Sequence, residues 1–144
     1  MSQFGKTKLV KKMHFDKSAQ EKLLTGIDKI AEAVGSTLGA SGRNVIIEND
    51  YGDPHVTKDG VTVANNILLQ DPVENIAVSM MKQAAQKTAS IAGDGTTTSI
   101  VLTKAIIDSF YKLKGQDFSF RDIKSGINKF AKDVIKYITD KAIP

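Results

Sequence analysis

The strongest chemical signal in the sequence is the segment AGDGTTT at residues 92–98, which precedes an apolar run that predicts a helix. Its two glycines let the backbone come close to a ligand. The free amide groups at a helix N-terminus attract an anion, and the threonine hydroxyls add further donors. Asp94 is suited to a hard cation such as Mg²⁺ that bridges phosphates. Taken alone, the segment fits a glycine turn with a threonine N-cap as well as it fits a nucleotide site.

Two further loops contain glycine and lie at the ends of predicted elements. The sequence TLGASGRN at residues 37–44 ends a predicted helix, and its two glycines flank a short turn. Lys58, Asp59 and Gly60 follow a predicted strand and combine a cation, a carboxylate and a flexible residue. Each of these loops alone fits an ordinary helix end or turn better than a ligand site. Together with residues 92–98, they favour a nucleotide site.

Apolar spacing and capping residues predict the helices that would position these loops. The first helix opens at Ser18, with Glu21 completing a capping box, and it ends at Gly39. The second helix begins with Asp71 as its N-cap and Pro72 at the first helical position. The broad apolar face of the second helix contains Val73, Ile76, Ala77, Met80, Met81, Ala84 and Ile91.

Two more helices are predicted in the second half of the chain. The third covers residues 97–113 and is apolar on most sides, which is typical of a helix buried among others. The fourth starts at Ser119, with Asp122 in the capping position. Its apolar residues repeat at helical spacing and are Ile123, Ile127, Phe130, Val134 and Ile138.

A different pattern separates the first two helices. Residues 44–48 and 55–58 flank a turn-rich stretch and predict a β-hairpin. A two-stranded hairpin alone is marginally stable in water, so we expect it to pair with another strand in this chain or in a neighbour. The predicted fold is mainly α: a helical bundle with a projecting β-hairpin.

The composition excludes several classes of protein. With 144 residues, 41% of them hydrophobic, the chain is long enough for one globular domain with a core. It has no cysteine and two histidines, which excludes disulfides and thiolate metal sites and disfavours a histidine zinc site. No apolar run approaches the length of a membrane span, and the first residues do not resemble a secretion signal. We therefore expect a cytoplasmic protein that does not bind membranes.

The net charge of +4 comes from the N-terminus. The 20 basic residues exceed the 16 acidic ones by four, and four lysines precede the first acidic residue, Asp16. The rest of the chain is neutral, and Arg43 and Arg121 are its only arginines. No basic stripe interleaves with aromatic residues, so we expect a solvated basic tail and no nucleic-acid partner.

The three loops together resemble the nucleotide-binding signatures of the chaperonins. The matching segments are TLGASGRNV at residues 37–45, TKDGV at residues 57–61 and AGDGTTT at residues 92–98. They occur in the family's order and at similar spacing, and the sequence GRNV is the group I, GroEL-like form. The similarity extends from about Ser18 to the end of the chain. Where the family usually has Pro-Lys, this chain has alanine and serine, at residues 40–41.

The resemblance implies a site for ATP and Mg²⁺. The adenine and phosphate side of the pocket would be lined by Thr37, Leu38, Gly39 and Ala40. Lys58 and Gly60 would lie by the phosphates, and the phosphate oxygens would be held by Gly95, Thr96, Thr97 and Thr98. Asp94 would bind Mg²⁺, and oxygens of Thr37, Lys58 and Thr97 are candidates for the family's K⁺ site. Asp59 would lie near the γ-phosphate and act as the catalytic carboxylate that positions the attacking water.

The resemblance also implies an assembly. The predicted hairpin is similar to the stem-loop by which each subunit joins a sheet on its ring neighbour, and identical subunits would form the ring. Residues 1–144 would be an incomplete N-terminal part of the equatorial, ATP-binding domain, ending near its junction with the intermediate domain. Unfolded client proteins and a cochaperonin would bind to regions absent from this chain.

Three functions remain open on the sequence. The first is an ATP-driven protein-folding ATPase to which this chain contributes part of the active site, although the 144-residue chain alone would be inactive. The second is a fragment that binds nucleotide or takes part in assembly without hydrolysis. The third, disfavoured by the three matched motifs, is a helical interaction protein whose glycine loops are turns only.

Overall fold

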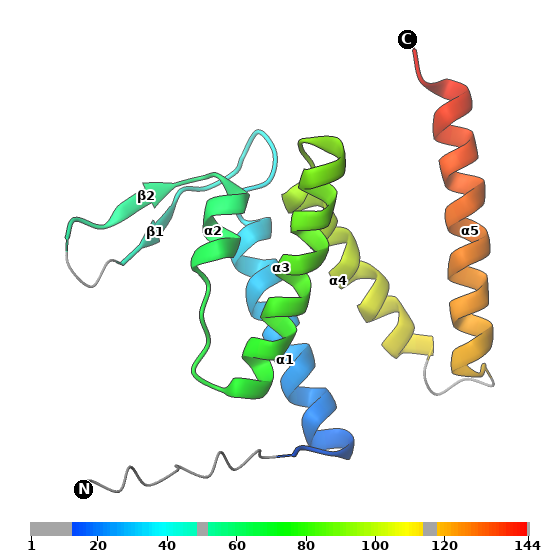
Figure 1. The fold of residues 1–144 in the computed structure, drawn as a ribbon, viewed down its shortest axis with the longest axis horizontal. Coiled ribbons are helices and arrows are strands. Elements are labelled where there is room, and N and C mark those ends of the chain that lie inside the picture. The colour runs from blue at the N-terminus through cyan, green and yellow to red at the C-terminus, as the bar shows by residue number, and fades with distance from the viewer. Residues whose placement is uncertain (1–12, 49–51, 114–117, 144) are drawn as a thin grey trace, which may run out of the picture. The chain divides into compact units, whose positions relative to one another are not determined.

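The computed structural model describes residues 13–48, 52–113 and 118–143 (Figure 1). The chain divides into two compact units, Met1–Leu102 and Thr103–Pro144. The elements of the described residues are, in order, α1 (Asp16–Gly35), β1 (Val45–Ile47), β2 (His55–Thr57), α2 (Gly60–Asn66), α3 (Pro72–Ala92), α4 (Thr96–Leu113) and α5 (Phe120–Lys141). This confirms the predicted fold class, which is mainly helical with one small hairpin. No helix of the described residues is both long and apolar enough to cross a membrane.

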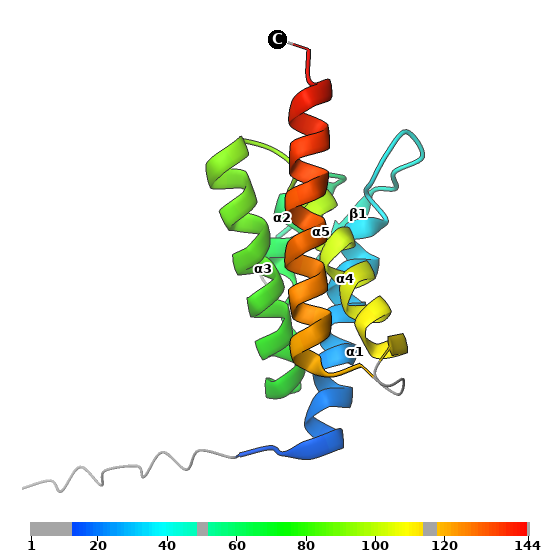
Figure 2. The same cartoon turned by 90° about the vertical axis from the view of Figure 1, so that its right-hand side faces the viewer.

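The core of the first unit lies where α1, α2 and α3 pack together, and the first turns of α4 complete it (Figures 1 and 2). Its buried members are small or β-branched, apart from one methionine, which lets the helices approach closely. They are Ile30, Ala31, Val34, Val63, Ala64, Val78, Met81, Ala85 and Ile100. Because all four helices contribute, the core fixes the ends of the helices and therefore the loops between them.

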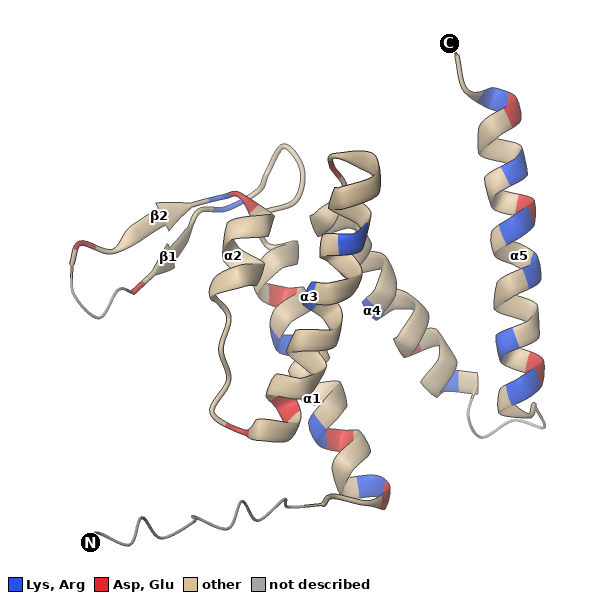
Figure 3. Cartoon of the chain, viewed as in Figure 1, with Lys and Arg blue, Asp and Glu red and all other residues tan. Residues whose placement is uncertain are grey.

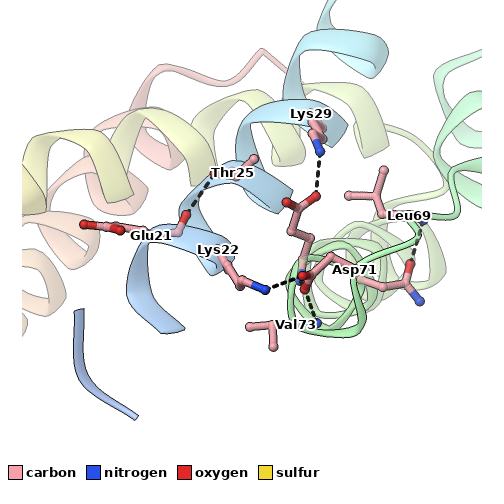
Figure 4. Close-up of polar contacts among 9 residues, drawn as sticks. Glu21, Lys22, Thr25, Lys29, Leu69, Asp71 and Val73 are labelled. Atoms are coloured by element: carbon pink, nitrogen blue, oxygen red, sulfur yellow. Dashed lines mark hydrogen bonds and ion pairs between the residues drawn. The ribbon is translucent and has the colours of Figure 1, made fainter. Parts of the chain in front are cut away.

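The contact between α1 and α3 requires a glycine. A Cβ atom added to Gly26 would lie 2.3 Å from the carbonyl oxygen of Glu74, which is backbone and cannot move aside. Two ion pairs flank this contact: Lys29 donates to Glu74 at 2.6 Å, and Lys22 pairs with Asp71 (Figure 4). The two helices are thus joined by close backbone packing with charged pairs beside it.

Asp71 also caps α3, as predicted. Its Oδ1 accepts hydrogen bonds from the amide groups of Val73, at 2.8 Å, and Glu74, at 3.2 Å. The hydrogen bond from Lys22 and these backbone amides lower the pKa of Asp71 to about 2. The carboxylate therefore accepts hydrogen bonds from the first amides of α3 and from Lys22 of α1 at the same time (Figure 4).

The hairpin has the predicted strands. β1 and β2 are antiparallel, with Val45 opposite Thr57, Ile46 opposite Val56 and Ile47 opposite His55. In Figure 1 the hairpin extends away from α1 and α3, and the side chains of Ile46 and Val56 are 70% and 55% exposed.

The predicted limits of the first helix were wrong at both ends. α1 begins at Asp16, and its N-cap is Phe15, which makes no capping side-chain hydrogen bond. Ser18 then lies inside the first turn, so the predicted capping box does not form. The helix ends at Gly35 because the chain turns there, with the Thr37 amide bonded to the carbonyl of Val34. Gly39 does adopt a left-handed φ of 79°, but in the loop beyond the helix.

The other predicted helices are present, with less burial than expected. On α3, Val73, Ala77 and Met81 are buried, but Ile76, Met80, Ala84 and Ile91 are exposed. On α4 the described buried residues are Thr96 and Ile100, so the prediction of a helix buried on most sides was wrong. The physical reason is that the apolar residues beyond Ile100, such as Leu102 and Ile106, have too few neighbours among the described residues to be covered.

The second unit contains the end of α4 and all of α5. Ser119 and Asp122 cap α5 reciprocally, since the Ser119 hydroxyl accepts from the Asp122 amide at 3.2 Å and donates to its carboxylate at 2.5 Å. Charged residues lie along the whole helix, and the basic ones outnumber the acidic ones (Figure 3). No residue of α5 is buried, although an apolar groove of about 490 Å³ runs along its first half, lined by Leu113, Phe118, Asp122, Ile123, Gly126, Ile127 and Phe130.

Candidate functional site

The three glycine loops meet at one end of the first unit (Figure 1). Gly60, the first residue of α2, is buried at this point. A Cβ atom added to it would lie 1.9 Å from the hydroxyl oxygen of Thr97 and 3.3 Å from that of Thr37. The loop after α1, the loop after β2 and the start of α4 therefore meet at Gly60. The structure brings together three segments that are far apart in sequence.

The loop after α1 is compact because its backbone bonds to itself. The Thr37 hydroxyl, which is buried, donates to the carbonyl of Val34 at 2.7 Å and keeps its oxygen lone pairs. A Cβ atom added to Gly42 would lie 2.2 Å from the carbonyl oxygen of Thr37. The remaining predicted site residues of this loop, Leu38, Gly39 and Ala40, are exposed. The loop thus presents an exposed edge with Thr37 at its base.

Asp59 is the N-cap of α2. Its carboxylate accepts hydrogen bonds from the amides of Val61, at 3.3 Å, and Thr62, at 3.0 Å, and from the Thr62 hydroxyl at 2.5 Å. The Thr62 hydroxyl is the main cause that lowers the pKa of Asp59, against an opposing effect of burial. The carboxylate is exposed, ionised and fixed in direction by three donors. Lys58, one residue earlier, is exposed.

Residues 93–98 turn the chain from α3 into α4. Gly93 and Gly95 have left-handed φ angles of 76° and 90°, which favour glycine. Asp94 lies between them, exposed, and its Oδ1 accepts from the Gly95 amide at 2.6 Å. The first intrahelical bond joins the Ser99 amide to the carbonyl of Gly95 at 2.8 Å.

The start of α4 is suited to an anion. The amides of Thr96, Thr97 and Thr98 belong to the first turn, where a helix offers its donors no acceptor of its own. Their dipoles add to the partial positive charge of the N-terminus. Thr88 of α3 and Ser99 of α4 are joined by a hydrogen bond of 3.2 Å between their hydroxyls, which holds the two helices together beside the loop.

The residues present fit Mg²⁺ better than a metal that requires several protein ligands. The described residues contain no group of three or more histidine, cysteine, aspartate or glutamate residues that could hold a metal. Asp94 would therefore supply a single carboxylate, and phosphate oxygens and water the other ligands, as is usual for Mg²⁺. Asp94 lies three residues before Thr97, so their Cα atoms are at most about 11 Å apart. Thr37 and Thr97 place two hydroxyl oxygens beside Gly60, which suits the predicted K⁺ ligands.

Sequence reasoning missed two parts of this site. The helix α2 was not predicted, although Asp59 followed by Thr62 has the spacing of an N-cap and its third-residue partner. Thr62 was also missed, yet it holds the carboxylate of Asp59 by both its amide and its hydroxyl.

Comparisons with known proteins identify the family of this chain. The family model described as the TCP-1/cpn60 chaperonin family matches residues 30–144. Among solved structures, the chain is similar to the chaperonin gp146 from the bacteriophage EL 2 (Pseudomonas aeruginosa), crystallised in the presence of ATP-BeFx. The identity is 36% and the TM-score is 0.62, over 73% of this chain. The match spans 18% of the length of the phage protein. The resemblance to the GroEL-like proteins is confirmed, and the chain belongs to the TCP-1/cpn60 chaperonin family.

Proposed function

We propose that this chain supplies part of an ATP and Mg²⁺ site in a ring-forming, ATP-driven protein-folding chaperonin. The observation that carries the proposal is the meeting of three glycine loops at Gly60, with the hydroxyls of Thr37 and Thr97 beside it. Membership of the chaperonin family supports the folding role, and the crystallisation of the related phage protein with ATP-BeFx supports the nucleotide.

Each loop has a separate task in this proposal. The amides and hydroxyls of residues 96–98 bind phosphate oxygens, and Lys58 adds a positive charge nearby. Asp94 holds Mg²⁺, which neutralises charge on the phosphates. Oxygen atoms of Thr37, Lys58 and Thr97 coordinate K⁺. Asp59 orients the attacking water with a carboxylate that Thr62 keeps ionised.

The metal role of Asp94 is testable by calorimetry. We expect the 144-residue chain to bind ATP more tightly with Mg²⁺ than without it, and Asp94→Ala to remove most of that difference, because the other carboxylate of the proposed site, that of Asp59, is bonded to Val61 and Thr62 of α2. Asp140→Ala, which removes an exposed carboxylate on α5, serves as the control and leaves the Mg²⁺ effect unchanged. An undiminished Mg²⁺ dependence in Asp94→Ala would contradict the assignment.

The hairpin is proposed to join a neighbouring subunit. Ile46 and Val56 form an opposed apolar pair that is largely exposed, and the described sheet has only two strands. In a subunit of full family length that contains this chain, Ile46→Lys is expected to shift sedimentation from rings to smaller species. A charge placed in an apolar contact loses its hydration there.

The matched control for this experiment is Ile46→Val, which keeps an apolar β-branched side chain and should preserve the rings. Rings that remain intact in Ile46→Lys would exclude the hairpin as an assembly element. The second candidate function is a fragment that binds nucleotide or takes part in assembly without hydrolysis. A measurement of ATP turnover distinguishes it from the first, which requires hydrolysis in the full-length subunit.

A further inference from the structure

The helix α2 is too short to be stable alone. It has seven residues, Gly60–Asn66, whereas isolated helices shorter than about 12 residues are marginal in water. Its N-terminus is satisfied by the carboxylate of Asp59. The carbonyl groups of its last turn lack the amide donors that a longer helix would provide. The amide of Ile67 satisfies one of them, the carbonyl of Ala64, at 3.3 Å.

A further donor comes from Lys82 on α3. The Lys82 ammonium donates to the carbonyl of Ile67 at 2.7 Å and to that of Asn65 at 3.0 Å. A cation at this end also opposes the negative end of the helix dipole. Gln86, one turn further along α3, donates to the Asn65 side chain at 3.4 Å. Partial burial lowers the pKa of Lys82, as expected for an ammonium that has exchanged water for carbonyl groups.

The two ends of α2 are therefore attached to different parts of the first unit. Gly60 lies against Thr97 and Thr37, and the other end is held by Lys82 about 10 Å away along the helix axis. Gly60 has little freedom to move, because a single added carbon would overlap Thr97. The same helix α3 that carries Lys82 leads directly into the loop at Gly93. A shift of α2 along α3 would thus displace Gly60 and Asp59 relative to Thr97.

We propose that Lys82 is a positioning residue of the nucleotide site: it ties the carboxyl end of α2 to α3 and thereby holds Asp59 and Gly60 against Thr97 and Thr37. This inference rests on the proposed nucleotide function. Lys82 acts through the backbone of α2 and does not touch the ligand. Val63 and Ala64 anchor the middle of α2 in the core, and Lys82 holds its carboxyl end against α3.

The test compares three variants of the 144-residue chain by calorimetry with ATP and Mg²⁺. Lys82→Met keeps the apolar stem but removes the charge and donors, and Lys82→Arg keeps both charge and donors. Lys87→Met removes an exposed lysine from the same helix and is the control. We expect Lys82→Met to weaken binding by about tenfold, the scale of one charged hydrogen bond. Lys82→Arg should restore affinity to within about twofold, and Lys87→Met should leave it unchanged.

Hydrogen exchange gives a second readout that does not depend on the ligand. In Lys82→Met the amides of Val63 and Ala64 should exchange faster than in Lys87→Met, while the circular dichroism of the two variants agrees. Wild-type affinity in Lys82→Met would overturn the positioning role and leave the nucleotide site intact. Equal loss of affinity and of helical content in Lys82→Met and Lys82→Arg would also overturn it, as a folding effect. A wild-type chain that binds no ATP would instead contradict the proposed function itself.

Discussion

Replacing Gly60 with alanine is expected to weaken ATP binding by roughly tenfold to a hundredfold, the cost of forcing a methyl group into a packed site. The added Cβ would lie 1.9 Å from the Thr97 hydroxyl oxygen and 3.3 Å from that of Thr37. Either Thr97 rotates away or α2 moves, and both changes separate the loops that form the site. Gly60 does not have a left-handed φ, so backbone strain makes no contribution.

The direction of this effect is informative because helix propensity predicts the opposite. Within a helix, alanine is favoured over glycine by about 1 kcal/mol, so alanine at an open position would stabilise the fold. Gly126→Ala in α5 supplies that control, since nothing lies within 4 Å of an added Cβ there. It should raise the melting temperature slightly and leave ATP affinity unchanged.

A double-mutant cycle with Thr97→Ala tests whether the clash between the added Cβ and the Thr97 hydroxyl causes the loss of affinity. Thr97→Ala removes the hydroxyl oxygen that lies 1.9 Å from the added carbon and leaves the Thr97 Cβ at 3.2 Å. Adding Gly60→Ala to Thr97→Ala should therefore cost much less affinity than adding it to the wild type. Strictly additive losses, measured by calorimetry, would mean that the two loops do not meet as the structure has them.

The features that the sequence predicted well are those that depend on neighbouring residues. The N-caps at Asp71 and Ser119 depend on residues at most a few positions away, and both were correct. The two strands of the hairpin, which are also close in sequence, were correct as well. The family motifs likewise identified the three loops that meet at Gly60. The roles of their residues in binding stay predictions.

The features that the sequence did not reveal depend on tertiary contacts. α2 contains Val61, Thr62 and Val63, whose β-branched side chains disfavour a helix. It is helical because Asp59 caps one end, Lys82 satisfies the other, and Val63 packs in the core. The glycine at position 26 looked unremarkable in an amphipathic helix, yet α3 approaches it more closely than any side chain would allow.

Burial was also misjudged, because periodicity shows which residues share a face but not what covers that face. The third predicted helix, α4, is apolar on most sides, and the fourth, α5, has apolar residues at helical spacing, yet Ile100 is their only buried apolar residue among the described ones. The spacing correctly indicated an apolar stripe on α5 from Ile123 to Ile138, but no packing partner was implied by it.

The structure changes how the proposed catalytic role of Asp59 has to be tested. Asp59→Ala would remove the proposed water-orienting carboxylate and the N-cap of α2 together. Loss of an aspartate cap alone costs about 1 kcal/mol of stability and would disturb Gly60. Asp59→Asn separates the two tasks, because asparagine is an equally good N-cap but carries no charge.

In a subunit of full family length that contains this chain, Asp59→Asn is expected to slow ATP turnover by roughly tenfold or more, the scale of a positioned acid–base group. ATP affinity should remain within a few-fold of the wild type, because a group that orients water contributes mainly in the transition state. Since the lowered pKa keeps Asp59 ionised at neutral pH, the wild type has the charge that the variant lacks.

Single-turnover hydrolysis and equilibrium binding, measured on the same samples, separate the two effects. Asp59→Ala should lose turnover to at least the same extent and should also lose some affinity, through the displaced Gly60. The 144-residue chain alone should show almost no hydrolysis, since it spans only 18% of the length of the related phage chaperonin and supplies only part of the proposed site. Robust hydrolysis by the isolated chain would contradict the proposal that it supplies only part of the active site. Parallel loss of binding and turnover in Asp59→Asn would show that Asp59 binds ATP rather than orienting the water that attacks it.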